Sequence, residues 1–228
     1  MSMLIAAAAA FVLLHLLVSG TRVRDALTGA IGPGPYMGLF SLASIVLLVW
    51  LIIAFIGAKN AGPVYWGATP VTRWIQIFVQ LVAFLLVVPG ITTRNPTSVR
   101  MEGALEKPDA ARGMVRITRH PFLWGVAIWA AGHLMVRGDP PSFLLFGSLL
   151  FLSVIGAFSI DAKRARTAPG TWPAFAAATS SVPFAAILQG RQKLVLGEIG
   201  AWRIGLALVL WALFLAFHTV LFGVSPMP

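Results

Sequence analysis

Six long apolar stretches constrain the fold of this chain more than any other feature of its sequence. A membrane-spanning helix needs about 20 mostly apolar residues, with a lower limit near 17. The stretches are Met3–Gly20, Leu39–Gly57, Trp74–Gly90, Pro121–Val136, Ser142–Ile160 and Arg203–Phe222. The fourth stretch is short, and it begins with a proline, which suits the first turn of a helix. The sequence therefore predicts an all-α, polytopic membrane bundle of about six transmembrane helices, with residues 1–228 forming one domain.

The composition excludes the ordinary soluble classes of protein. Only 11% of the residues are charged, against about 25% in a soluble domain, and the mean hydropathy is +0.88. The chain has no cysteine, which excludes disulfides, iron–sulfur clusters and zinc sites built on Cys. A further apolar segment, Val182–Leu188, is too short to span a bilayer and is expected to be interfacial or re-entrant.

The basic residues predict the orientation of the chain. With six spans and both termini outside, 14 of the 17 Lys and Arg residues fall on the cytoplasmic side, and only Lys59, Arg73 and Arg137 fall outside. Cytoplasmic loops of membrane proteins carry such an excess of cations. The net charge of +10 is then explained by membrane topology and contact with anionic lipid, and no nucleic-acid partner is expected.

The ionisable side chains inside the spans are mainly histidines. His15, His133 and His218 lie in the first, fourth and sixth stretches, and His120 lies at the cytoplasmic mouth of the fourth. A lone membrane histidine usually hydrogen-bonds between helices, whereas three on separate helices favour a metal or haem site. No carboxylate accompanies them, which argues against a di-iron carboxylate centre. Imidazole suits haem iron, and helix depth alone leaves open whether His15 or His218 pairs with His133.

The densest polar stretch, Arg112–Pro121, precedes the fourth span. Guanidinium groups bind carboxylates in a bidentate manner, and a helix N-terminus favours anions. Arg116, Arg119 and His120 are therefore candidates to hold the propionates of haem. The alternative is that this stretch only marks the cytoplasmic side.

Three motifs carry a family resemblance. The segments Arg116–Gly125, His133–Asp139 and Ser159–Arg164, together with His15 near the N-terminus, resemble the NnrU family of bacterial membrane proteins. This family includes the plant 15-cis-zeta-carotene isomerase, a haem b enzyme. The resemblance implies haem b with His15 and His133 as iron ligands and catalytic residues, and a redox-dependent cis–trans isomerisation of a lipophilic polyene. It also implies the bacterial inner membrane as location.

Two other functions remain open at this stage. Bacterial members of the family are linked to denitrification, which implies a non-enzymatic accessory factor for nitrite or nitric oxide reductase that docks a membrane protein partner. A weaker resemblance, carried by Arg119–Pro121 and Gly170–Trp172, is to isoprenylcysteine-type membrane methyltransferases that use S-adenosylmethionine. This chain departs from that pattern because Ile160 and Asp161 stand where that family has two adjacent glutamates.

Overall fold

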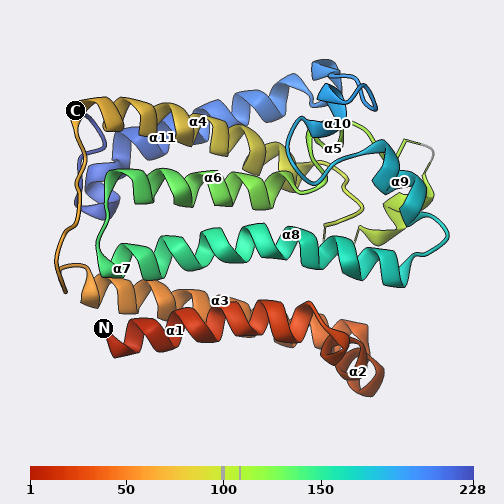
Figure 1. Ribbon diagram of the computed structural model, residues 1–228, viewed down its shortest axis with the longest axis horizontal. Helices are drawn as coiled ribbons and strands as arrows, with labels where there is room; N and C mark the ends of the chain where they lie inside the picture. Colours follow the sequence, from red (N-terminus) through yellow and green to blue (C-terminus); the bar gives the residue numbers. More distant parts are fainter. Residues whose placement is uncertain (99–100, 108) are drawn as a thin grey trace.

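The computed structural model describes residues 1–98, 101–107 and 109–228. Over these residues the chain is a helical bundle without a β-strand; a single β-bridge joins Trp66 to Gly138. The long helices run side by side along one axis (Figure 1). Arg100, counted above among the cytoplasmic cations, lies outside the described residues.

Two long connections, residues 93–120 and 168–200, separate consecutive long helices and contain short helical elements of their own. The long elements are α1 (Ser2–Leu13), which η1 (Leu14–Ser19) continues, α3 (Pro33–Ala58), α4 (Pro70–Thr92), α6 (Pro121–Val136), α8 (Ser148–Thr167) and α11 (Ala201–Phe222). Shorter elements are α2 (Arg22–Ile31), η2 (Glu102–Glu106), α5 (Met114–Ile117), α7 (Pro140–Ser142), η3 (Phe143–Gly147), α9 (Trp172–Ala178), α10 (Ala185–Leu188) and η4 (Leu196–Glu198). Of the η segments, η1 and η3 are π-helical turns that continue α1 and lead into α8.

The six predicted helices are confirmed. Five of them are long and apolar enough to cross a membrane, and α6, with 16 residues, is shorter. The weak apolar segment near residue 185 forms only the four-residue turn α10. Helix α11 exposes most of its apolar surface: Ala207 is its buried residue, and Val220 is 82% exposed. These helices make the chain an integral membrane protein.

One predicted boundary is wrong in a way that matters for the site. The fifth stretch was expected to end at Ile160, but α8 continues to Thr167. Charged residues end a hydropathy stretch without ending a helix. The helix ends just before Pro169 and Gly170, where proline disfavours the helical conformation of the residue preceding it. Asp161 and Lys163 are therefore helical residues with defined directions.

Both termini lie at the same end of the bundle (Figure 1). The connections between α4 and α6 and between α8 and α11 both lie at the opposite end, with α5, α9 and α10. This arrangement agrees with an even number of crossings and gathers the basic segments at one end. We call that end the inner end.

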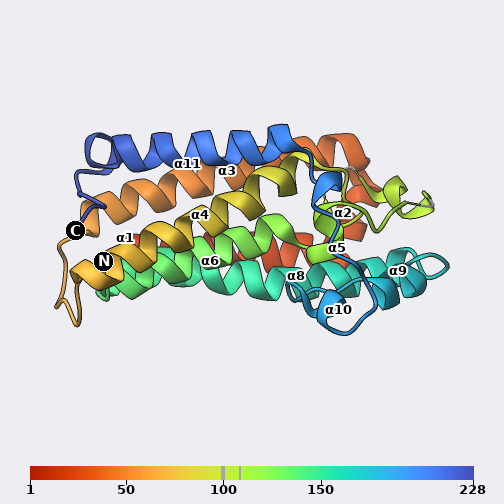
Figure 2. The ribbon, with the colours of Figure 1, turned by 90° about the horizontal axis from the view of Figure 1, so that it is seen from above.

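Helices α4 and α6 approach most closely, with α4 lying between α6 and α11 (Figure 2). Glycines on α6 make this approach possible. A Cβ atom added at Gly125 would lie 2.9 Å from the Ala83 carbonyl oxygen, and one added at Gly132 would collide with the Gln76 side chain. Small residues at helix contacts let backbones pack closely inside membranes.

Two apolar clusters hold the long helices together. One joins α1, α3 and η3 through residues such as Leu4, Phe11 and Leu51. The other joins α4 to the segments around α5 and α11 through Leu86, Met114 and other side chains. Helix α8 contacts both α1 and α6, so these three helices adjoin one another.

The α4–α6 contact predicts opposite effects for two Gly→Ala substitutions. Gly125→Ala should destabilise the bundle by about 1–3 kcal/mol because the new methyl group overpacks against α4. Gly205→Ala on α11, where nothing lies within 4 Å of an added Cβ, should be neutral or stabilising by up to about 1 kcal/mol. Thermal unfolding of both variants in the same detergent measures the difference. Equal melting temperatures would refute the close contact.

Candidate functional site

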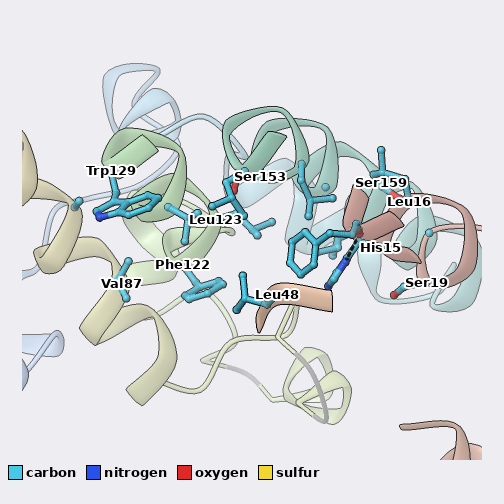
Figure 3. Close-up of a pocket in the computed structure, with 18 of the residues that line it drawn as sticks. His15, Leu16, Ser19, Leu48, Val87, Phe122, Leu123, Trp129, Ser153 and Ser159 are labelled. Atoms are coloured by element: carbon cyan, nitrogen blue, oxygen red, sulfur yellow. Dashed lines mark hydrogen bonds between the residues drawn. The ribbon is translucent and has the colours of Figure 1, made fainter. Parts of the chain in front are cut away.

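An apolar cavity of about 500 Å³ lies inside the bundle. Its volume is within the range of about 300–1,000 Å³ that is typical of ligand sites. Figure 3 shows Trp129 at one end and His15, Ser19 and Ser159 at the other. The walls come from α1 with η1, α3, α4, α6 and α8. Along α8 the lining runs from Leu149 to Lys163, a length of about 21 Å at 1.5 Å per residue.

His15 is the histidine that lines this cavity. Its Nδ1 lies 2.8 Å from the Phe11 carbonyl oxygen, so Nδ1 carries the proton and donates a hydrogen bond to this oxygen. The other nitrogen, Nε2, then accepts from the Ser44 hydroxyl at 3.1 Å. His15 lies within the π-helical turn η1, and π-bulges inside helices often mark functional sites. The sequence predicted the residue but carried no signal for the π turn or for Ser44.

His133 lies in the last turn of α6 and outside the cavity lining. Its Nδ1 is 2.8 Å from the carbonyl oxygen of Trp129, and its ring stacks on Phe146 with 4.6 Å between centroids. Phe146 belongs to the second π-helical turn, η3. His133 therefore lies one helical turn beyond Trp129, which forms the end of the cavity.

His218 occupies the outer part of α11, where its Nδ1 lies 2.7 Å from the Val224 carbonyl oxygen. All three membrane histidines thus direct Nδ1 to a backbone carbonyl. Metal-ligating histidines commonly have this orientation, which leaves Nε2 as the lone-pair donor. The chemistry of each imidazole therefore fits an iron ligand.

The positions of the histidines do not form a pair in one cavity. His15 is about 20 Å from the Ser2 end of its helix, whereas His133 is about 5 Å from the Val136 end of α6. Both helix ends lie at the same end of the bundle (Figure 1). No group of three or more side chains capable of holding a metal occurs among residues 1–98, 101–107 and 109–228. Of the three membrane histidines, His15 is therefore the one that lies in the cavity wall.

Asp161 organises the inner end of the bundle. Its carboxylate accepts hydrogen bonds from Arg119 Nε and Nη2 at 3.3 and 2.6 Å. It also pairs with His120 Nε2 at 2.8 Å. Arg119 further donates to the Thr179 hydroxyl and lies over the Trp172 ring. The two residues expected to bind a propionate are thus joined to a carboxylate of the chain itself.

Arg116 has a carboxylate partner as well. Its Nε and Nη2 donate to the two oxygens of Glu198 at 2.7 and 2.9 Å, and its Nη1 donates to Gln192. The hydrogen bonds from Arg116, with one from the Gly113 backbone, lower the pKa of Glu198 to about 2. The same contact raises the pKa of Arg116. This pair ties the segment before α6 to the segment before α11.

Sequence reasoning missed the partners that complete these clusters. No pattern in the sequence points to Asp161 or Glu198 as the partners of these arginines. Lys163, at the inner end of the cavity, is one of the 14 cations expected on the cytoplasmic side, with no role of its own predicted. A signal for Lys163 does exist, because Ser153, Gly156, Ile160 and Lys163 follow helical spacing and all line the cavity. That signal requires knowing that α8 continues past Ile160.

Comparisons with known proteins show the family of this chain. A family model described as "NnrU protein" matches residues 3–226. The chain belongs to the NnrU family. Two curated relatives, the chloroplastic 15-cis-zeta-carotene isomerases of Zea mays and Arabidopsis thaliana, are each 29% identical, over 177 and 180 residues. Each match covers 75% of this chain and 47% of the relative.

This NnrU-family chain therefore spans about half the length of the curated relatives it matches. No solved structure matches it.

Removing the Asp161 carboxylate should strongly destabilise the inner end. In Asp161→Ala the guanidinium of Arg119, 10% exposed, would remain buried without its counter-ion, which costs about 3–5 kcal/mol. Asp25→Ala removes a carboxylate that is 41% exposed in its ion pair with Arg166 and should cost at most about 1 kcal/mol. Thermal unfolding in detergent compares them. Similar losses would show that the Asp161 cluster does not hold the bundle.

The Arg116–Glu198 pair predicts a specific pH dependence of stability. Folding lowers the pKa of Glu198 from 4.5 to about 2. The stabilisation is therefore complete above pH 4.5 and is lost as the pH falls toward 2. The melting temperature of the wild-type protein should exceed that of Glu198→Gln at pH 7, and the gap should close over this window. Glu106→Gln, which changes an exposed carboxylate at the same end, is the matched control at pH 7. A gap that persists unchanged at pH 2 would contradict the pairing.

Proposed function

We propose that this protein is a membrane isomerase that changes the double-bond geometry of a lipophilic polyene bound in the cavity beside His15. One observation carries the proposal: an apolar cavity about 21 Å long, inside a membrane bundle, has an imidazole at one end. The similarity to two 15-cis-zeta-carotene isomerases supports the same class of reaction. We place the protein in the bacterial inner membrane.

The walls of the cavity suit such a substrate. Phe84, Phe122 and Trp129 contribute aromatic faces, and Leu123 with Val126 contributes aliphatic surface. Burial of apolar surface stabilises a bound polyene by about 25 cal/mol per Å². An extended polyene would lie along α8 and reach toward His15, and the surrounding helices would keep water away from it. The substrate would enter from the lipid phase, in which it is dissolved.

We further propose that the cavity binds haem b through Nε2 of His15, which the Phe11 carbonyl orients by accepting from Nδ1. When bound, haem b supplies a redox-active iron that can interact with the π electrons of a polyene and lower the barrier to rotation about a double bond. The Ser44 hydroxyl lies 3.1 Å from Nε2, and this hydrogen bond would have to break for His15 to hold haem. His133 stays a predicted second ligand through the family resemblance.

Neither alternative function is favoured by a contact in the described part of the chain. Arg119 and His120, which a methyltransferase would use at the inner mouth, are paired with Asp161. The basic segment that a denitrification complex would dock is largely joined to carboxylates of the same chain. The cavity is the feature that supports a ligand, and its lining is mostly apolar.

The isomerase proposal predicts activity in a purified system. Wild-type protein in lipid vesicles, kept reduced and in the dark, should convert 15-cis-zeta-carotene to another isomer, measured by liquid chromatography. His15→Ala should lower the rate at least about tenfold, the scale on which changes around a metal ligand act. His218→Ala, outside the cavity lining, should retain the wild-type rate. Unchanged activity in His15→Ala would refute the role of His15.

An absorption spectrum tests the cofactor separately. Purified wild-type protein should contain haem b in near-stoichiometric amount by a pyridine haemochrome assay, and His15→Ala should lose most of it. Protein that stays colourless after haem is added would refute the haem proposal, whatever the isomerase assay shows.

A further inference from the structure

Lys163 lies in the wall between two pockets. It lines the apolar cavity and also a second, polar pocket of about 330 Å³ at the inner end. The second pocket is formed by α2, η2 and the end of α8, with Arg24, Glu102, Glu106 and Arg164 among its residues. A ligand that extended from one pocket into the other would therefore pass the Lys163 ammonium group.

The neighbouring cations at the inner end already have carboxylate partners. Arg164 pairs with Glu102 at 3.0 Å, and Arg24 lies 3.6 Å from Asp25. Arg116 and Arg119 are held by Glu198 and Asp161, as described above. Within the described residues, Lys163 has no carboxylate within 4.0 Å. Its charge is thus the one facing the cavity that a ligand can neutralise.

Lys163 is also only partly exposed, beside an apolar lining. Placing a charged group against apolar surroundings is unfavourable unless it is paired. An anionic group at this position would form a charge-assisted hydrogen bond, which is roughly twice as strong as one between neutral groups. The position of Lys163 therefore favours a ligand with a negative charge at one end and an apolar body at the other.

We propose that the apolar cavity binds an amphiphilic carboxylate, with its carboxylate at Lys163, where the two pockets meet, and its apolar body among the apolar lining residues. This inference rests on the proposed function in one respect, because both use the cavity as a ligand site. The same chemistry has two sources, a carboxylate of a porphyrin cofactor and a fatty acid from the membrane. If the ligand is the porphyrin, Lys163 would hold a propionate, the role that the sequence predicts for Arg116, Arg119 and His120.

Quenching of Trp129 fluorescence tests the proposal, since Trp129 lines the cavity. The full-length protein in detergent at pH 8 is titrated with 9,10-dibromostearic acid and, separately, with the neutral 9,10-dibromostearyl alcohol. The acid should bind at least about tenfold more tightly than the alcohol, as expected for a hydrogen bond to a charged group. Trp129→Phe should lose most of the quenching, which assigns the signal to the cavity.

Three lysine variants locate the charge. Lys163→Met should reduce the ratio of the affinities for the acid and the alcohol to near one. Lys163→Arg keeps the positive charge and should keep this ratio. Lys193→Met, which removes an exposed lysine in the connection before α11, is the matched control and should keep the full preference. Equal affinities of the wild type for acid and alcohol would overturn the proposal in this arm. So would equal effects of Lys163→Met and Lys193→Met.

A second arm uses zinc protoporphyrin IX and its dimethyl ester in place of the brominated lipids. If only the brominated acid is preferred over its alcohol, and this preference depends on Lys163, the ligand is a fatty acid. If only the free porphyrin is preferred over its dimethyl ester, and this preference depends on Lys163, the ligand is the porphyrin cofactor. Preference in neither arm overturns the inference. If wild-type protein shows the preference but no isomerisation, only the proposed function fails; isomerisation without the preference refutes this inference alone.

Discussion

The partly buried carboxylate of Asp161, with its pairing to Arg119 and His120, is the interaction on which the inner end of the bundle depends. The side chains of Arg119 and His120 are 10% and 1% exposed, and burying their polar groups without a partner would be costly. Both residues immediately precede Pro121, where α6 begins. Their pairing with Asp161 therefore sets the position of α6 against α8. The cavity between these helices depends on that position.

Because α8 continues past Ile160 to Thr167, Asp161 and Lys163 lie on the same helix. Residues two positions apart on an α-helix are related by a rotation of about 200° about the helix axis, so their side chains face nearly opposite sides. Asp161 is directed toward Arg119, and Lys163 consequently lies on the side of α8 that lines the cavity. One short helical segment thus holds the bundle together and supplies a cation to the ligand space. The π-helical turn at His15 presents an imidazole to the same space.

Much of the fold could be predicted because hydropathy reports burial in lipid directly. Each of the six apolar stretches became a helix, and Pro121–Val136 has the predicted bounds. The errors fall where helix ends are set by other rules. The second stretch begins earlier, at Pro33, and α8 ends later, at Thr167. Proline decides both ends, since Pro33 begins α3 and Pro169 follows the end of α8. The charged residues of α8 do not end it.

The sequence by itself determined the number of helices, the gathering of cations toward one end and the presence of imidazoles inside the bundle. Only the tertiary structure decided which of these groups meet. It joined Arg119 to Asp161, 42 residues away, placed His15 in the cavity and left His133 outside its lining. Hydropathy says that a helix is in the membrane but not how far it is rotated or shifted along its axis. Those two quantities decide which side chains share a site.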